Sequence, residues 1–136
     1  MPSDFVFLAE SRQSMLSAAG AGPFCYIGDC ARAGALPSGS RAFDLKEKKK
    51  HAKDCGGAVD GFKIRKLELF VIAKSAEFQS VALDGMEELY EKDRKEFVNF
   101  FRAVAANARK KKKPIYILAR NDMLWDLAFF SDRILR

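Results

Sequence analysis

The stretch from residue 78 to residue 119 constrains the fold more than any other part of the sequence. A short apolar run at 78–83 and a buried-type run at 115–119 flank a long segment, 86–110, with the 3, 4, 7 spacing of one buried helical face. Asp84 and Glu87 have the spacing of a capping box at its start, and Pro114 prevents the helix from continuing. A strand, a helix and a strand in this order predict two parallel strands joined by a right-handed crossover.

The other predicted elements follow from shorter patterns. Residues 62–73 alternate in hydrophobicity with a change of parity at Arg65–Lys66, which predicts a strand with a bulge, paired with 78–83 across residues 74–77. Residues 41–53 have a helix-forming composition with little apolar stripe, which predicts at best an exposed helix. The rest of the prediction is a strand at 4–9, a helix at 11–19, a strand at 24–27, a loop at 28–40 and a final helix from Asn121 or Asp122 to Leu135.

Together these elements predict an α/β protein, with α+β as the open alternative. We expect a mixed sheet of about four to five strands, with the long amphipathic helix and the apolar C-terminal helix packed on it. The length of 136 residues and the hydrophobic content of 49% suit a single domain over 1–136 with its own core. A flexible loop region rich in Gly, Ser and Lys is expected at about 28–60.

The compartment is inferred from the cysteines and the N-terminus. Three cysteines cannot all pair with one another, and the first ten residues carry acids and no leading positive charge. No apolar run approaches the length of about 20 residues that a membrane span needs. We therefore expect an intracellular protein in a reducing compartment, with free or metal-bound thiols. That compartment is the cytoplasm, or an organelle interior if a presequence was removed.

The net charge of +6 is concentrated in two segments. Residues 41–53 hold six basic residues and two acids, and residues 109–120 hold six basic residues and no acid, so the rest of the chain is slightly acidic. This distribution favours a polyanionic partner, with nucleic acid (RNA favoured) or an acidic protein surface as the two classes. The candidate phosphate-binding residues are Lys46, Lys48, Lys49, Lys50, Lys53, Arg109, Lys110, Lys111, Lys112, Lys113 and Arg120.

All three cysteines and the only histidine lie in one stretch, as Cys25-x4-Cys30 and His51-x3-Cys55. Thiolate and imidazole are the ligands that Zn²⁺ prefers, and two close pairs suit a tetrahedral site. A structural zinc ion that holds the lysine-rich segment is therefore one hypothesis. In the alternative, Cys25 is a core residue, Cys30 and Cys55 are loop thiols, and His51 belongs to the basic segment.

Three classes of enzyme leave incomplete motifs in the sequence. Asp60 and the predicted strand ending at Lys74 suggest a degenerate nuclease-like metal site, but the acid position before the lysine holds Ile72, and Glu68 is six residues away. Residues 81–84 followed by two glutamates have the outline of a Walker B strand, yet no G-x-x-x-x-G-K-[ST] loop precedes them. No G-x-S-x-G occurs either, so the balance is against an enzyme.

The sequence therefore predicts a non-catalytic protein that binds nucleic acid, with RNA favoured, as a component of a ribonucleoprotein or a larger assembly. Lysine-rich segments would contact phosphate. The apolar C-terminal helix would pack in the core or contact other protein subunits through Trp125, Phe129 and Phe130. Two alternatives remain: a structural subunit of a complex without nucleic acid, and a degenerate nuclease-like enzyme.

Overall fold

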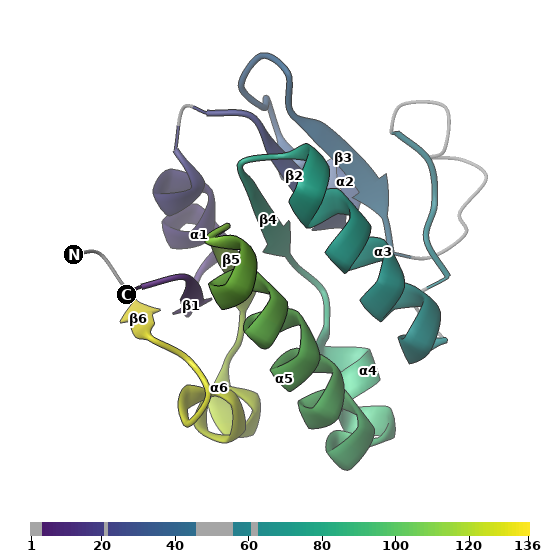
Figure 1. Ribbon diagram of the computed structural model, residues 1–136, viewed down its shortest axis with the longest axis vertical. Helices are drawn as coiled ribbons and strands as arrows, with labels where there is room; N and C mark the ends of the chain where they lie inside the picture. Colours follow the sequence, from purple (N-terminus) through teal and green to yellow (C-terminus); the bar gives the residue numbers. More distant parts are fainter. Residues whose placement is uncertain (1–3, 21, 46–55, 61–62) are drawn as a thin grey trace.

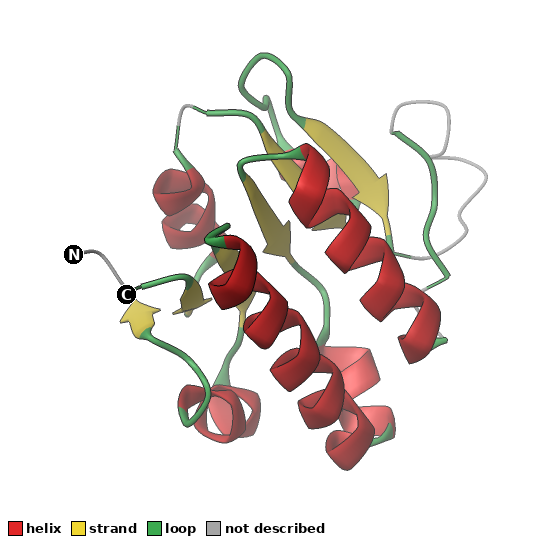
Figure 2. Cartoon of the chain, viewed as in Figure 1, coloured by secondary structure: helices red, strands yellow, loops and turns green. Residues whose placement is uncertain are grey.

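The chain folds into an α/β structure with one parallel sheet between two layers of helices (Figures 1 and 2). The computed structural model describes residues 4–20, 22–45, 56–60 and 63–136. Its elements are, in chain order, β1 (Val6–Ala9), α1 (Arg12–Ala19), β2 (Phe24–Gly28), α2 (Cys30–Ala33), β3 (Arg41–Asp44), α3 (Ile64–Glu77), β4 (Ser80–Leu83), α4 (Glu87–Lys92), α5 (Arg94–Lys111), β5 (Ile115–Leu118), α6 (Asn121–Ala128) and β6 (Arg133–Leu135). The predicted fold class is confirmed.

The sheet has six strands in the order β3-β2-β4-β5-β1-β6, and every pair is parallel. This differs from the mixed sheet of four to five strands that the sequence predicts. The strands β2, β4 and β5 are buried along their whole length, which suits central strands covered by helices on both faces. The predicted crossover is confirmed, since β4 and β5 are parallel neighbours joined through α4 and α5.

The direction of each connection decides which face its helix covers. Right-handed crossovers that run toward β3 place α1 and α2 on one face, and those that run the other way place α3, α5 and α6 on the opposite face. Figure 1 shows α3 and α5 side by side across the sheet. The α5 side buries Phe97, Phe100 and Phe101, and the α1 side buries Met15 and Tyr26.

The predicted strand at 62–73 is wrong, because residues 64–77 form the helix α3. Its buried side chains are Leu67, Val71 and Ser75, which follow one another at intervals of four residues. Leu69, which would share a face with Leu67 in a strand, is 54% exposed. The shift in hydrophobic alternation at Arg65–Lys66 therefore reflects the spacing of a helix. Residues 74–77, which were predicted to be a turn between two strands, form the last turn of α3.

The prediction for residues 28–53 is wrong in two places where the structure describes them, while residues 34–40 form the predicted loop. Residues 41–44 form the edge strand β3, paired with β2 from Cys25↔Arg41 to Gly28↔Asp44, where a helix was predicted. The short helix α2 lies inside the predicted loop. Phe43 accounts for the position of β3, because its buried ring packs edge-to-face on Phe70 of α3 at 5.2 Å. Residues 46–53 of the predicted helix lie outside the described residues.

The two predicted C-terminal helices are each shorter than expected. The long helix is divided at Asp93, which caps α5 by accepting a hydrogen bond from the Glu96 amide at 3.0 Å, so the capping signal lies at Asp93–Glu96 and not at Asp84–Glu87. The last helix ends at Ala128, and the chain then adds β6 to β1. In the described part of the chain, no helix combines the length and the apolar character needed to cross a bilayer.

Candidate functional site

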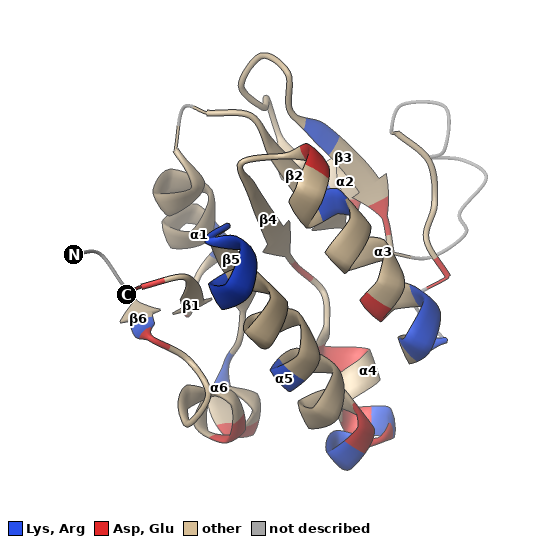
Figure 3. Cartoon of the chain, in the orientation of Figure 1, with Lys and Arg blue, Asp and Glu red and all other residues tan. Residues whose placement is uncertain are grey.

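The two ends of the sheet differ in charge (Figure 3). At the carboxyl ends of the strands, Asp29, Asp44 and Asp84 follow or end β2, β3 and β4, and Glu87 and Glu88 begin α4. At the amino ends, Arg41 begins β3, Arg133 begins β6, and α5 ends in Arg109 and the lysines 110–113 just before β5. Basic residues also lie at the carboxyl end, at the starts of α3 and α5, so that end is mixed in charge, whereas the amino ends around the end of α5 are mainly basic and attract a polyanion.

Lys110, Lys111 and Lys112 lie at the C-terminal end of α5, where the helix dipole favours positive charge. Lys112 ends the helix in the left-handed region at a φ of 56°, and its amide donates to the Ala108 carbonyl. All three side chains are exposed, and none forms an ion pair with a carboxylate in the described part of the chain. Their ammonium groups are available to a partner.

The other basic residues predicted between 109 and 120 have partners inside the fold. Arg109 donates through Nη2 to the Phe130 carbonyl at 2.6 Å and to Asp132 Oδ1 at 2.9 Å. Lys113 donates to the Phe78 carbonyl at 3.3 Å. Arg120 follows β5 at the opposite end of the sheet and donates to the Glu10 carbonyl at 3.0 Å. The structure therefore keeps 109–113 together and separates Arg120 from them.

A groove runs between α5 and the turn that follows α6. It is lined by Asn99, Arg102, Ala106, Arg109 and Phe130, among others. The Arg102 guanidinium lies over the Phe130 ring, 5.2 Å from its centroid, and has no carboxylate partner among the described residues. Two cationic side chains and an aromatic ring therefore share one groove, and Arg109 is followed directly in the sequence by the lysines at the end of α5.

Two large aromatic side chains are exposed beside this groove. Trp125 is 75% exposed and Phe129 is 87% exposed. The Phe129 ring contacts the Phe130 ring edge-to-face, with 5.3 Å between the centroids. Of the three aromatic residues predicted to contact a partner, Trp125 lies within α6, four residues before Phe129, and Phe130 joins Phe129 to the arginine groove.

Asp132 fixes the wall of the groove. Its Oδ2 accepts from the Phe5 and Val6 amides at 2.8 and 3.0 Å, and its Oδ1 accepts from Arg109. Burial alone would raise the pKa of Asp132, but the hydrogen bonds from the Phe5 amide, Arg109 and the Val6 amide outweigh burial and lower it. The ionised form is therefore favoured in the folded state.

The Asp132→Asn variant is expected to be less stable than the wild type near neutral pH by about 1 kcal/mol. Because the folded pKa lies below the unfolded value, the stabilisation by Asp132 is fully present above the unfolded pKa of about 3.9. It is lost as the pH falls through the folded pKa. Urea unfolding near neutral pH and at about pH 3 measures the difference in unfolding free energy between the wild type and the variant, which should be smaller in acid. A difference of the same size at about pH 3 would contradict this account.

A buried polar cluster lies between the carboxyl ends of β1, β2 and β4. The Asp84 side chain, 3% exposed, accepts from Arg12 Nε and from the Tyr26 hydroxyl, both at 2.5 Å, in place of its predicted role as a helix cap. Burial, followed by the hydrogen bond to Asp84, raises the pKa of the Tyr26 phenol. Only Glu10 and Ser11 separate β1 from α1, so no phosphate-binding loop of the P-loop kind is present there.

A cavity of about 210 Å³ opens at the carboxyl ends of β2 and β4, whose outgoing helices cover opposite faces. Ligands of open α/β sheets usually bind at such a position. Here the lining includes Asp29, Asp44, Glu87 and Glu88 with one cation, Arg32. The acidic lining disfavours a phosphate group. A nucleic-acid site is therefore expected at the other end of the sheet, at the amino ends of the strands.

Comparisons with protein-family models, curated proteins and solved structures find no match.

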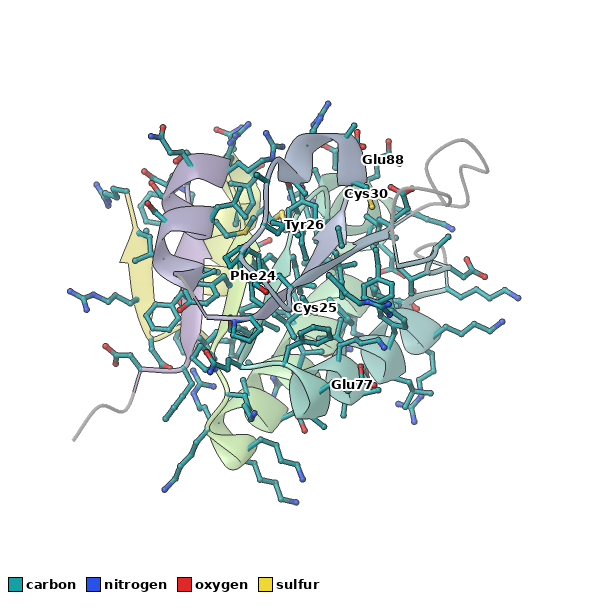
Figure 4. The ribbon with its side chains drawn as sticks, turned by 90° about the horizontal axis from the view of Figure 1, so that it is seen from above. Phe24, Cys25, Tyr26, Cys30, Glu77 and Glu88 are labelled. Carbon is teal, nitrogen blue, oxygen red and sulfur yellow. The ribbon has the colours of Figure 1, made fainter. Side chains whose placement is uncertain are left out.

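The structure describes two of the four predicted zinc ligands. Cys25 is buried in β2 on the α3 side of the sheet, where burial raises the pKa of its thiol to about 12, whereas Cys30 begins α2 on the other side (Figure 4). Cys30 is disulfide-bonded, which differs from the expectation of free or metal-bound thiols. His51 and Cys55 lie outside the described residues, as do Lys46, Lys48, Lys49, Lys50 and Lys53. Within the described ranges no group of residues is arranged to hold a metal ion.

The three residues of the nuclease-like alternative do not form the motif that suggested it. Glu68 and Lys74 both lie on α3, about 9 Å apart along its axis, and not on a strand. Glu68 pairs with Arg65, and Lys74 pairs with Glu77 at 2.7 Å. Asp60 lies outside both helix and strand, before α3. The strand-borne pair of an acid and a lysine is therefore absent from the described residues.

Sequence reasoning missed the groove. Arg102, Ala106 and Arg109 recur at four and three residues, and no acid follows Glu96 in α5. That pattern identifies a basic helical stripe in the sequence itself. The position of Phe130 against this stripe is set by the turn between α6 and β6, and no local pattern predicts it.

Proposed function

We propose that this protein binds nucleic acid without catalysing a reaction on it, as a component of a ribonucleoprotein or a larger assembly. Lys110, Lys111 and Lys112 contact the phosphates. The observation that carries the proposal is that these three consecutive lysines are exposed at the end of α5 with no carboxylate partner in the described part of the chain. Ammonium groups placed in this way displace the counterions of a phosphate backbone.

The charges around the lysines support the same partner. Arg133 begins β6, two strands from β5 and therefore about 10 Å from it across the sheet, so its charge adds to theirs. Asp132, which precedes Arg133 in the sequence, is already engaged by Arg109 and two backbone amides. The acids at the carboxyl ends of the strands lie at the far end of the molecule. The resulting field orients a polyanion onto α5.

The test compares two triple variants with the same change in net charge. Lys110, Lys111 and Lys112 are changed to Gln in one, and Lys63, Lys66 and Lys95, which are exposed elsewhere, are changed to Gln in the control. Binding of a fluorescein-labelled oligouridylate is measured at several salt concentrations. We expect the first variant to bind about tenfold or more weakly at low salt, with a salt slope shallower by about 2, because three phosphate contacts on a single strand contribute about 0.7 each.

The control variant should bind nearly as the wild type does, since its lysines lie away from the end of α5. Equal losses in the two variants would show that only overall charge matters and would overturn the assignment of the site. Wild-type binding in the variant of Lys110, Lys111 and Lys112 at every salt concentration would overturn the proposed function and favour an acidic protein partner.

A further inference from the structure

We infer that the occupant of this surface is a single strand, whose phosphates follow the basic stripe of α5 while its bases stack on Trp125 and Phe129. This inference rests on the proposed function and deepens it. It adds a second set of contacts, made by aromatic side chains of the C-terminal region, to the lysines that end α5. The combination of a cationic groove and exposed aromatic rings is the usual means of holding single-stranded nucleic acid.

The exposure of the two aromatic side chains is the first observation. Within the described residues, the large hydrophobic side chains that remain exposed are Leu69, Trp125 and Phe129, and two of these three are neighbours at the end of α6. Trp125 and Phe129 are four residues apart, so they share one side of the helix end. Leaving two large rings in water is unfavourable, and a stack with a base would cover them.

The basic stripe beside the rings is the second observation. Arg102 and Arg109 lie about 10 Å apart along α5 on the face that lines the groove, and Lys110 continues that face. Phe130 connects the two sets of contacts, because its ring touches Phe129 on one side and the Arg102 guanidinium on the other. A strand with its phosphates on the stripe therefore has its bases within reach of the rings.

The acidic residues near this surface each have a partner inside the protein, and two of them, Asp122 and Asp126, share the exposed side of α6 with Trp125 and Phe129. Asp126 accepts a hydrogen bond from the Tyr90 hydroxyl, and Asp122 lies 3.6 Å from Arg94. Asp132 is held by Arg109 and two backbone amides. Beside the groove and at the end of α5, Arg102 and Lys110, Lys111 and Lys112 form no ion pair with a carboxylate in the described part of the chain.

Charge decides between a single strand and the other occupants of an aromatic patch. A second copy of the chain, seated on the same rings about a two-fold axis, would bring two sets of Arg102 and the α5 lysines together, and like charges repel. A duplex offers phosphate to the lysines but keeps its bases stacked in the helix. An unpaired strand satisfies both the cations and the rings, which neither a second copy nor a duplex does.

Trp125 is the only tryptophan of the chain, so its fluorescence reports directly on this surface. Titration of the wild-type protein with oligouridylate should quench that fluorescence. An abasic oligodeoxynucleotide of equal length and a matching duplex should bind through phosphate and leave the fluorescence nearly unchanged. Quenching by the abasic strand equal to that by oligouridylate would contradict stacking on Trp125.

Substitution of the rings gives a second readout. Trp125→Ala and Phe129→Ala should each weaken oligouridylate binding by about 5-fold to 100-fold, as expected for the loss of one stacked base. Trp125→Phe and Phe129→Tyr should restore most of the affinity, because the ring is kept. Leu69→Ala, at an exposed apolar residue of α3, is the matched control and should bind as the wild type does. The salt slope should be unchanged in all five variants, since no phosphate contact is lost.

The outcomes separate this inference from the proposed function. If both alanine variants bind as the wild type does and the lysine variant does not, the single-strand inference is wrong and the proposed function stands. If the alanine variants change a dimer to a monomer in sedimentation and leave oligouridylate binding intact, the rings form an interface between copies and the inference is wrong. If the lysine variant binds normally, the proposed function itself fails.

Discussion

Leu67→Ala is expected to lower the free energy of unfolding by about 2–5 kcal/mol, whereas Leu69→Ala should change it by about 0.5 kcal/mol or less. Leu67 is fully buried against the core on the inner face of α3, and Leu69 is 54% exposed on the same helix. The two substitutions remove the same atoms, so the difference between them measures burial alone. Urea unfolding with a common m-value provides both numbers.

The pair also tests the secondary structure of this segment. In a strand, Leu67 and Leu69 share a face, and both substitutions would cost a similar amount. In α3 they lie about 200° apart around the axis, so only one of them can face the core. Similar losses for the two variants would contradict the helix and favour the alternation that the sequence suggests.

Asp84→Ala is expected to destabilise the protein by about 3 kcal/mol, the lower end of the range for removing one partner of a buried pair. The value is at the lower end because the Arg12 side chain is 28% exposed and can turn toward water after the carboxylate is lost. The Tyr26 hydroxyl cannot do so, since Tyr26 is fully buried and is left without its acceptor. Thermal or urea unfolding of the variant measures this loss.

A double-mutant cycle with Tyr26→Phe isolates the hydrogen bond between the two residues. Tyr26→Phe alone removes the donor and leaves Asp84 with Arg12, so we expect a smaller loss of about 1–2 kcal/mol. The double variant should lose less than the sum of the two single losses, because the unpaired hydroxyl is then absent. Losses that add to within about 0.5 kcal/mol would show that the two side chains are not coupled.

The central part of the fold could be predicted from the sequence because its signals are local. The strands β1, β2, β4 and β5 are short apolar runs bounded by breakers, and the buried face of α5 repeats at helical spacing over its whole length. Their order around a long helix indicates a parallel pair. The strands are buried on both faces and the helix along a full stripe, so the apolar residues of each segment are sufficient to predict its secondary structure.

The wrong predictions fall where tertiary contacts decide the structure. Phe70 and Ile72 make α3 apolar on several sides, because this helix packs on both the sheet and α5, and such a segment resembles a buried strand. The strands β3 and β6 lie at the edges of the sheet, with four and three residues, and each begins with an arginine. Their pairing with β2 and β1 defines them, and a local pattern does not contain it.

The basic residues of the candidate site could be predicted from the sequence, but the three-dimensional arrangement of their partners could not. The lysine run is visible in the sequence as a set of side chains too concentrated for solubility alone. The partner of Asp84 lies 72 residues away, so a residue that has the spacing of a helix cap becomes half of a buried ion pair. Likewise, Arg102 meets Phe130 only because α6 ends at Ala128 and the chain turns back along α5 to form β6.

The most direct test of the central claim is the salt dependence of oligouridylate binding by the wild-type protein. The account predicts measurable binding at low salt and a log–log slope of about −2 or steeper, because at least the three lysines that end α5 displace counterions from a single strand. Absence of binding at low salt, or an affinity that does not change with salt, would contradict the account.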